Sequence, residues 1–196
     1  KRLVVKVGTS TLTYENGRLN LRRIESLVKV LSDLKNAGRE IVLVTSGAIG
    51  VGAGHLGLKE RPRDIGGKQA AAAVGQCELM YTYDKQFSEY GHVTAQVLLT
   101  RDVVEDDRRK SNVVNTLCRL LEYGAVPIIN ENDTVATEEI EFGDNDTLSA
   151  LVAELVGADA LVLLTDIDGL YDADPHQNPD AHPIPEVRII DQNLLK

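Results

Sequence analysis

Short apolar runs recur along the chain and are separated by longer amphipathic segments. Five of these runs, rich in valine, isoleucine and leucine, are expected to form strands: Leu3 to Val7, Ile41 to Thr45, His92 to Leu99, Val126 to Ile129 and Ala160 to Thr165. Continuous apolar runs of this length are typical of strands buried on both faces. The pattern therefore predicts a mainly parallel sheet with helices on both sides.

Helical periodicity fills the intervals between the runs. The clearest helix carries its apolar residues on one face: Leu21, Ile24, Leu27, Val28, Leu31 and Leu34. Gly38 follows as a C-cap, which completes a strand–helix–strand unit. Further helices are expected over residues 67–90, 111–122 and 146–155. No repeat or linker divides the chain, so we predict one α/β domain, a three-layer α/β/α sandwich.

Two stretches lack such periodicity. Residues 131–145 are polar around a short alternating segment and are expected to form a loop or hairpin. Residues 166–185 contain four prolines and are expected to be irregular. Long loops in a compact domain are usually functional or mobile.

The composition narrows the classes of function. The net charge of −9 and the pI of about 4.9 argue against nucleic acid and anionic lipid as partners. The apolar runs are far shorter than the roughly 20 residues of a membrane-spanning helix, and no secretory signal is evident. Cys77 and Cys118 are expected to be small buried residues in a reducing cytoplasm. The histidines and cysteines lack zinc-ligand spacing, so no protein metal site is predicted.

In parallel sheets, ligands bind beyond the carboxyl ends of the strands. The first run leads from Lys6 into Gly8, Thr9 and Ser10, and the second leads into residues 45–50, TSGAIG. Both segments offer glycines for close backbone approach, with N–H and hydroxyl donors for an anion. The alternative is that the glycines only form tight turns. Two such segments beside an inward-facing lysine favour a phosphate site.

Polar residues also gather later in the chain. Residues 130–133, NEND, end a buried strand and could either start a turn or bind the α-amino group of an amino acid. Residues 143–146, GDND, precede a helix. An N-cap role accounts for one of the three Asp and Asn residues but not for the other two. Thr165 and Asp166 follow the last apolar run.

The chain carries no functional match to three well-known ligand-binding motifs. Gly52, Gly54 and Gly57 spell GxGxxG, but the string begins too far after its strand to be a dinucleotide fingerprint. No Walker motif occurs. The aspartates between Asp166 and Asp174 do not follow the order of an EF-hand calcium loop.

Six segments in this order resemble the glutamate 5-kinase family of the amino-acid kinase superfamily. They are KVGTSTLT from Lys6, VTSGAIGVG from Val44, KQAAAAVGQ from Lys68, VPIINENDTVAT from Val126, GDNDTLSA from Gly143 and LLTDIDGLYDADP from Leu163. The last is shared with uridylate kinases and aspartokinases, whereas KVGTS, VTSGAI and INENDTVAT are more specific. The resemblance spans essentially the whole chain.

The resemblance implies an amino-acid kinase (carbamate kinase-like) fold and phosphorylation of the γ-carboxylate of L-glutamate by ATP with Mg²⁺. This is the first step of proline biosynthesis, with proline as feedback inhibitor. It also implies a cytoplasmic homo-oligomer, a dimer or tetramer, whose N-terminal part binds glutamate and whose C-terminal part binds the nucleotide. The family places a glycine-rich segment with a second lysine after the region where this chain ends. We therefore expect residues 1–196 to be truncated, and to bind glutamate better than they turn it over.

Residue roles follow from the same resemblance. Lys6 would contact the transferring phosphoryl group, and Asp146 would orient the catalytic lysines. The positions that would bind glutamate are Ser46, Gly47, Ala48, Asp133 and Asn145. The positions that would bind ATP, besides Lys6, are Gly8, Thr9, Ser10, Thr165 and Asp166.

Alternative functions make different demands on the same residues. Uridylate kinase, with its phosphate-bearing acceptor, would favour arginines near that acceptor, whereas residues 44–52 and 130–146 contain neither arginine nor lysine. Aspartokinase and acetylglutamate kinase remain competitors. A silent sensor of glutamate or proline would not need the phosphate clamp of Lys6 and Asp146. Origin from a bifunctional pyrroline-5-carboxylate synthetase would leave the local chemistry unchanged.

Overall fold

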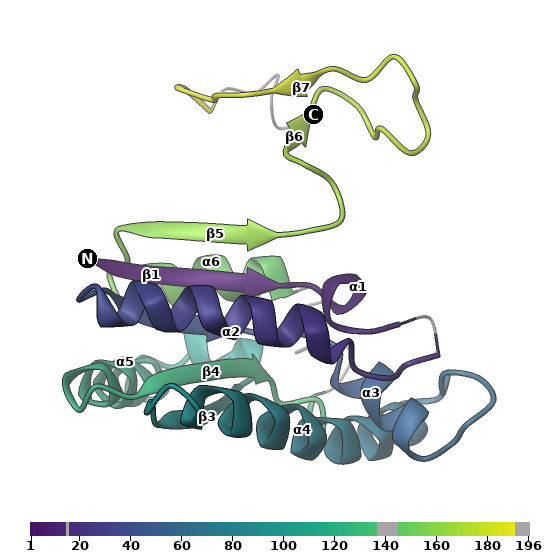
Figure 1. The fold of residues 1–196 in the computed structure, drawn as a ribbon, viewed down its shortest axis with the longest axis horizontal. Helices are drawn as coiled ribbons and strands as arrows, with labels where there is room; N and C mark the ends of the chain where they lie inside the picture. Colours follow the sequence, from purple (N-terminus) through teal and green to yellow (C-terminus); the bar gives the residue numbers. More distant parts are fainter. Residues whose placement is uncertain (15, 137–144, 191–196) are drawn as a thin grey trace. The chain divides into compact units, whose positions relative to one another are not determined.

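A computed structural model describes residues 1–14, 16–136 and 145–190. It forms two compact units, Lys1–Thr165 and Asp166–Lys196. The described residues of the first unit form a five-stranded sheet whose strands, in chain order, are β1 Arg2–Val7, β2 Glu40–Val44, β3 Thr94–Leu99, β4 Val126–Glu131 and β5 Ala160–Leu164. All pairings are parallel, in the spatial order β3-β4-β2-β1-β5 (Figure 1). The predicted strands are therefore confirmed.

Helices connect the strands. The predicted ones are α2 Leu21–Asn36, α4 Ile65–Ser88, α5 Asp107–Glu122 and α6 Asn145–Leu155. Three short elements were not predicted: α1 Thr9–Leu12, α3 Ala48–His55 and the 3₁₀ turn η1 Arg101–Val104. Their few residues, and the glycines of α3, give no helical periodicity to detect. Side-chain caps from Asn20, Asp64 and Asp106 fix where α2, α4 and α5 begin.

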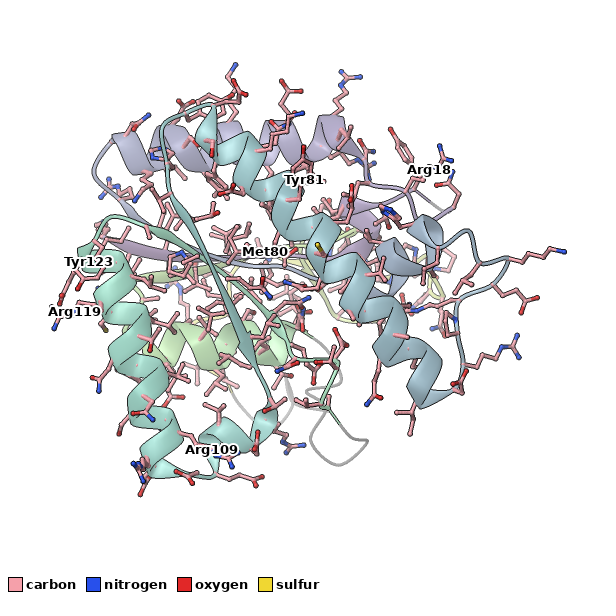
Figure 2. The ribbon with its side chains drawn as sticks, turned by 90° about the horizontal axis from the view of Figure 1, so that it is seen from below. Arg18, Met80, Tyr81, Arg109, Arg119 and Tyr123 are labelled. Carbon is pink, nitrogen blue, oxygen red and sulfur yellow. The ribbon has the colours of Figure 1, made fainter. Side chains whose placement is uncertain are left out.

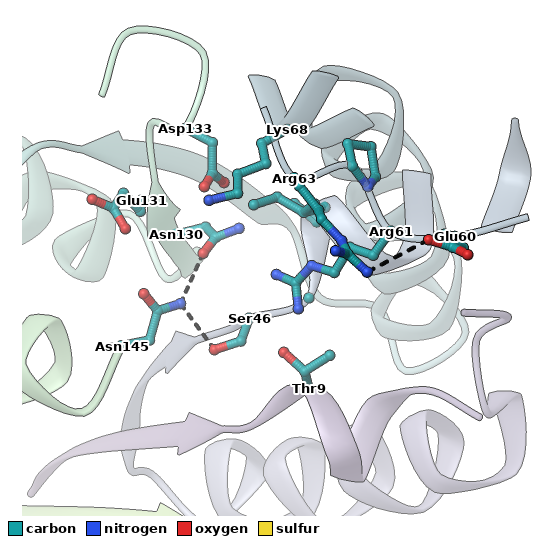
Figure 3. A pocket seen from close by; sticks show the side chains of 14 residues that line it. Thr9, Ser46, Glu60, Arg61, Arg63, Lys68, Asn130, Glu131, Asp133 and Asn145 are labelled. Carbon is teal, nitrogen blue, oxygen red and sulfur yellow. Dashed lines mark hydrogen bonds and ion pairs between the residues drawn. The ribbon is translucent and has the colours of Figure 1, made fainter. Parts of the chain in front are cut away.

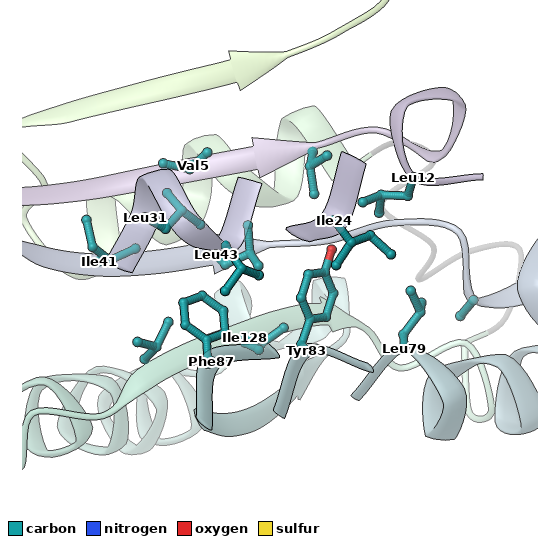
Figure 4. Close-up of a cluster of buried hydrophobic side chains, with 14 of the residues drawn as sticks. Val5, Leu12, Ile24, Leu31, Ile41, Leu43, Leu79, Tyr83, Phe87 and Ile128 are labelled. Atoms are coloured by element: carbon teal, nitrogen blue, oxygen red, sulfur yellow. The ribbon is translucent and has the colours of Figure 1, made fainter. Parts of the chain in front are cut away.

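Side chains alternate between the two faces of the sheet along each strand, so the sheet has a hydrophobic core on each face. Val5, Val7, Leu43 and Ile128 face α2, α3 and α4 in one core (Figure 4). Val4, Val42 and Ile129 share the other core with residues of α5 and α6. The two-residue period of a strand sends successive side chains to opposite faces. The predicted α/β/α sandwich is confirmed.

β5 departs from the prediction that every apolar run is buried on both faces. Val162 and Leu163 are 41% and 46% exposed. Among the described residues β5 pairs only with β1, which leaves it at the edge of the sheet. An edge strand has a neighbouring strand on one side only, so its side chains keep more contact with solvent.

Two further expectations about burial are wrong. Cys77 is exposed and Cys118 is half-buried, because each lies toward the solvent side of its helix. On α4, Leu79 is buried, whereas Cys77 is exposed one turn before Tyr81. Tyr81 lies on the outer face of this helix (Figure 2). Leu21, at the first position of α2, is 57% exposed.

The second unit contains a small ladder within the stretch that was predicted to be irregular. β6 Leu170–Tyr171 pairs antiparallel with β7 Pro183–Ile184. The Tyr171 hydroxyl donates to Asp168 Oδ1 at 2.6 Å, and this hydrogen bond lowers the pKa of Asp168. The loop or hairpin expected at residues 131–145 falls largely on residues 137–144, outside the described residues. No helix in the described parts of the chain is long and apolar enough to cross a membrane.

Candidate active site

The carboxyl edge of the sheet brings the segments after β1, β2 and β5 together. The backbone N–H of Gly8 donates to the carbonyl of Leu164, the last residue of β5, at 3.3 Å. Gly47, the N-cap of α3, has φ +97°, and a Cβ there would lie 3.3 Å from Thr9 Cγ2. Both the left-handed backbone and the close contact favour glycine. The loop after β1 is therefore held between the other two.

Lys6 and Asp146 form an ion pair at this edge. Lys6 is the penultimate residue of β1 and is 8% exposed, and its Nζ lies 2.5 Å from Oδ1 of Asp146 in the first turn of α6. A buried ammonium is costly without an anionic partner. A Cβ at Gly8 would lie 3.7 Å from the same Nζ, so the chain passes closely over the ammonium as it leaves β1. The site thus holds one positioned cation.

Asn145 joins β2 and β4 at the neighbouring position. Its amide nitrogen lies 2.9 Å from Ser46 Oγ and 2.9 Å from Asn130 Oδ1, and it also donates to the carbonyl of Thr45. An amide has two hydrogens, so these three oxygens share them. Because Asn145 and Asp146 are adjacent in α6, the same helix turn fixes both the ion pair and the amide network.

Buried polar groups support this network from beneath. The Asn130 amide donates to Gln76 Oε1 at 2.8 Å, and Thr45 Oγ1 lies 3.0 Å from the hydroxyl of Tyr83. Tyr83 is fully buried, and burial raises its pKa far above the ordinary value, so the phenol stays neutral. The ends of β2 and β4 are therefore tied to α4 by two hydrogen bonds.

A cavity of about 850 Å³ opens beside this network (Figure 3). Its lining includes all five residues predicted to bind glutamate, together with Thr9: Ser46, Gly47, Ala48, Asp133 and Asn145. Lys6, Gly8 and Ser10 lie just outside this lining, on β1 and the segment after it. Thr165 follows Leu164, next to Gly8, whereas Asp166 begins the second unit.

Charged residues that the sequence reasoning missed also line the cavity. Arg61 and Arg63 come from the segment between α3 and α4, and Lys68 comes from the first turn of α4. Residues 44–52 and 130–146, taken alone, suggested an acceptor region without cations. The cavity lining shows that cations are present there. Arg61 and Arg63 stand between the motif segments, and Lys68, although it opens the segment KQAAAAVGQ, was assigned no role. The charge-dense stretch 59–64, KERPRD, was the available signal.

Close packing of α3 on α4 sets one wall of the cavity. A Cβ at Gly52 would lie 1.7 Å from the carbonyl oxygen of Ala71, and one at Gly75 would lie 1.8 Å from that of Ala48. Gly52, part of the GxGxxG string, therefore serves packing. Gly57 ends the same segment with φ +68°, a conformation that glycine adopts easily.

Comparison with known proteins identifies a matching family and similar proteins. Residues 1–193 match the model of the amino acid kinase family. The chain is 61% identical over 191 residues to glutamate 5-kinase of Clostridium perfringens, a match that covers 95% of this chain and 71% of the relative. It is 58% identical over 195 residues to glutamate 5-kinase of Thermoanaerobacter sp., a match that covers all of this chain and 52% of the relative. The chain thus spans between about half and about 71% of the length of these relatives.

Solved structures agree on the fold. An isopentenyl phosphate kinase in a substrate complex is 26% identical, with a TM-score of 0.65 over 93% of this chain and 78% of that one. The product complex of the T. acidophilum isopentenyl phosphate kinase is 23% identical, with a TM-score of 0.63 over 92% and 77%. With a family model covering nearly every residue, and curated relatives more than half identical, the chain belongs to the amino acid kinase family.

Proposed function

We propose that the protein containing this chain transfers the γ-phosphoryl group of ATP to the γ-carboxylate of L-glutamate, forming γ-glutamyl phosphate. One observation carries the proposal: Lys6 is ion-paired with Asp146, and Asn145, the neighbour of Asp146 in α6, lines a polar cavity. The similarity to glutamate 5-kinases supports glutamate as the acceptor. The product would serve as the first intermediate of proline biosynthesis.

The reaction brings two anions together, so the site must supply positive charge and oriented donors. Lys6 would contact the transferring phosphoryl group and offset its charge, and Asp146 would hold that ammonium in place. No general base is required, because a γ-carboxylate with a pKa near 4 is ionised at pH 7. The chemistry therefore depends on position and electrostatics.

Glutamate would occupy the cavity. Gly47 and Ala48 stand at the start of α3, where backbone N–H groups can receive the γ-carboxylate, and Ser46 and Asn145 add side-chain donors. The carboxylate of Asp133 would accept a hydrogen bond from the α-ammonium group. In this arrangement the N-terminal part of the domain binds the acceptor.

The nucleotide would bind next to it, along β1 and β5. Gly8, Thr9 and Ser10 would hold the phosphates with backbone and hydroxyl donors, and Thr165 and Asp166 would line the nucleotide pocket in the C-terminal part. Among the described residues no three His, Cys, Asp or Glu side chains gather to hold a metal ion. Mg²⁺ would bind through the nucleotide phosphates, where it would neutralise charge.

Three wider properties belong to the same proposal. Proline would inhibit as the end product, the protein would act in the cytoplasm, and the subunits would assemble as a dimer or tetramer. Each is supported by the resemblance to glutamate 5-kinases.

Coupled ADP release by the full-length protein tests the reaction. The acceptors would be glutamate, aspartate, N-acetylglutamate, UMP and isopentenyl phosphate, each with ATP and Mg²⁺ and with or without proline. We expect turnover with glutamate alone, suppressed by proline. Turnover with another acceptor would reject glutamate as the substrate, and glutamate binding without turnover would indicate a sensor.

A further inference from the structure

The candidate cavity carries charge of both signs. Asp133 and Glu131 line it from the segment at the end of β4, while Lys68 enters from α4 (Figure 3). A free amino acid carries an ammonium and an α-carboxylate on one carbon. A cavity with carboxylates on one wall and a cation on another is matched to that pair of charges.

Three cationic side chains from the described part of the chain line the cavity, and they differ in how firmly they are placed. Arg61 is exposed, and Arg63, whose side chain is 92% exposed, lies 3.7 Å from Glu60 on the same loop. An exposed pair of this kind contributes little positional order. Lys68 is half-buried and belongs to a long helix.

The backbone at Lys68 is fixed from two sides. Its N–H donates to the carbonyl of Asp64 at 3.0 Å, and the Asp64 side chain caps the helix by accepting from Gly67 N–H at 2.8 Å. Further along, α4 packs against α3 through Gly75, in direct backbone contact. Among the described residues Lys68 forms no ion pair within 4 Å, so its ammonium is available to a ligand.

We propose that Lys68 binds the α-carboxylate of the amino-acid acceptor and thereby selects a free α-amino acid. This inference rests on the proposed function. The γ-carboxylate must lie near Lys6 to receive the phosphoryl group, and the carboxylate of Asp133 suits the α-ammonium. The α-carboxylate is then the one charged group of glutamate that still lacks a partner, and the ammonium of Lys68 supplies that partner. Lys68 is a specificity-determining residue in this arrangement and takes no part in the transfer.

Substitution of Lys68 in the full-length protein tests the assignment. The two acceptors would be L-glutamate and L-isoglutamine, which has an amide in place of the α-carboxylate and keeps the γ-carboxylate. For Lys68→Met we expect the glutamate KM to rise about 10- to 100-fold, the range of a hydrogen bond between charged groups. The kcat, the ATP KM and kcat/KM for isoglutamine should change by less than about threefold, so discrimination between the two acceptors is lost.

Two further variants separate binding from structure. Lys68→Arg keeps the positive charge and should restore most of the glutamate affinity. Lys85→Met, an exposed lysine in the last turn of the same helix, should behave as wild type. If Lys68→Met is poorly folded, Lys68→Gln replaces it in the same comparison.

The outcomes distinguish this inference from the proposed function. An unchanged glutamate KM in a folded Lys68 variant would overturn the role of Lys68 alone. An equal loss with both acceptors would assign Lys68 a structural role and overturn it as well. Absence of glutamate turnover in the wild-type protein would overturn the proposed function, and this inference with it.

Discussion

The ammonium of Lys6 lies 2.5 Å from the carboxylate of Asp146, although β1 and α6 stand far apart in the sequence. The parallel order of the sheet accounts for this contact. β4, which precedes α6, pairs with β2, and β5, which follows it, pairs with β1, so α6 crosses the face of the sheet behind β1 and β2. The start of α6 is thereby placed at the carboxyl edge of the sheet, where Lys6 is the penultimate residue of β1.

This pairing predicts unequal effects of its two members on turnover. Lys6→Met should lower kcat by about 10²- to 10³-fold, because it removes a donor aimed at developing charge. Asp146→Asn should lower kcat by on the order of 100-fold, since the ammonium loses the group that positions it. ADP release at saturating glutamate measures both variants, with circular dichroism to check folding. Lys29→Met, exposed on α2, is the control, and retention of more than a tenth of kcat by Lys6→Met would contradict the assignment.

Asn145 predicts an effect on acceptor binding. Asn145→Asp replaces a donor by an acceptor beside Ser46 Oγ, Asn130 Oδ1 and the Thr45 carbonyl. The Thr45 carbonyl oxygen and Asn130 Oδ1 cannot donate a hydrogen bond to the new carboxylate. Its negative charge would also repel the γ-carboxylate of glutamate. We expect the glutamate KM to rise by more than about 10-fold, the equivalent of one charge-assisted hydrogen bond. Asn145→Ala should raise it less. Asn112→Asp, exposed on α5, should leave KM unchanged, and an equal effect of Ala and Asp at Asn145 would argue against repulsion.

The contact between α3 and α4 predicts a loss of stability. A Cβ at Gly75 would lie 1.8 Å from the Ala48 carbonyl oxygen, so the two helices must separate. Gly75→Ala should lower the free energy of unfolding by about 3 kcal/mol, at the upper end of overpacking effects. Urea unfolding measures the change. Gly66→Ala on the same helix, where the nearest atom would lie 3.6 Å away, should be neutral or slightly stabilising, because alanine favours helix. Equal stability of the two variants would contradict the close contact.

Much of the fold could be predicted because apolar periodicity reports burial directly. β1 and β2 are central strands, and their continuous apolar runs match their environment. β5 has the same kind of run but lies at the sheet edge among the described residues, and composition alone does not distinguish the two positions. α3, short and rich in glycine, is held by tertiary contact with α4 and has no periodicity of its own.

The candidate site was predictable where polar residues follow a strand end or, like Asn145, open a helix, and it was not predictable at Lys68. Ser46 and Asp133 come directly after β2 and β4, and the parallel topology places both at the cavity. Lys68 lies in the first turn of α4, where nothing local indicates that its side chain faces a ligand. Its position depends on the glycine contacts that bring α4 to this edge, and those are visible only once the helices are packed.

Tyr83 predicts how stability depends on pH. Its hydroxyl lies 3.0 Å from Thr45 Oγ1 in the buried core, so Tyr83→Phe should cost about 1–2 kcal/mol of unfolding free energy at pH 7 by leaving the threonine without its partner. Burial raises the pKa of Tyr83 above its ordinary value of 10.0. Below pH 10 the phenol is neutral in both states, and the wild-type advantage is complete.

Above pH 10 the unfolded chain releases this proton while the folded protein retains it, so the wild type loses about 1.4 kcal/mol per pH unit that the variant does not lose. The difference between the two proteins should therefore shrink between pH 10 and 11 and then reverse. Urea unfolding at pH 7, 9, 10 and 11 measures it. Tyr81→Phe, exposed on the same helix, should show no such pH dependence. A constant difference between wild type and Tyr83→Phe across this range would mean that Tyr83 ionises equally easily in the folded protein, against its burial.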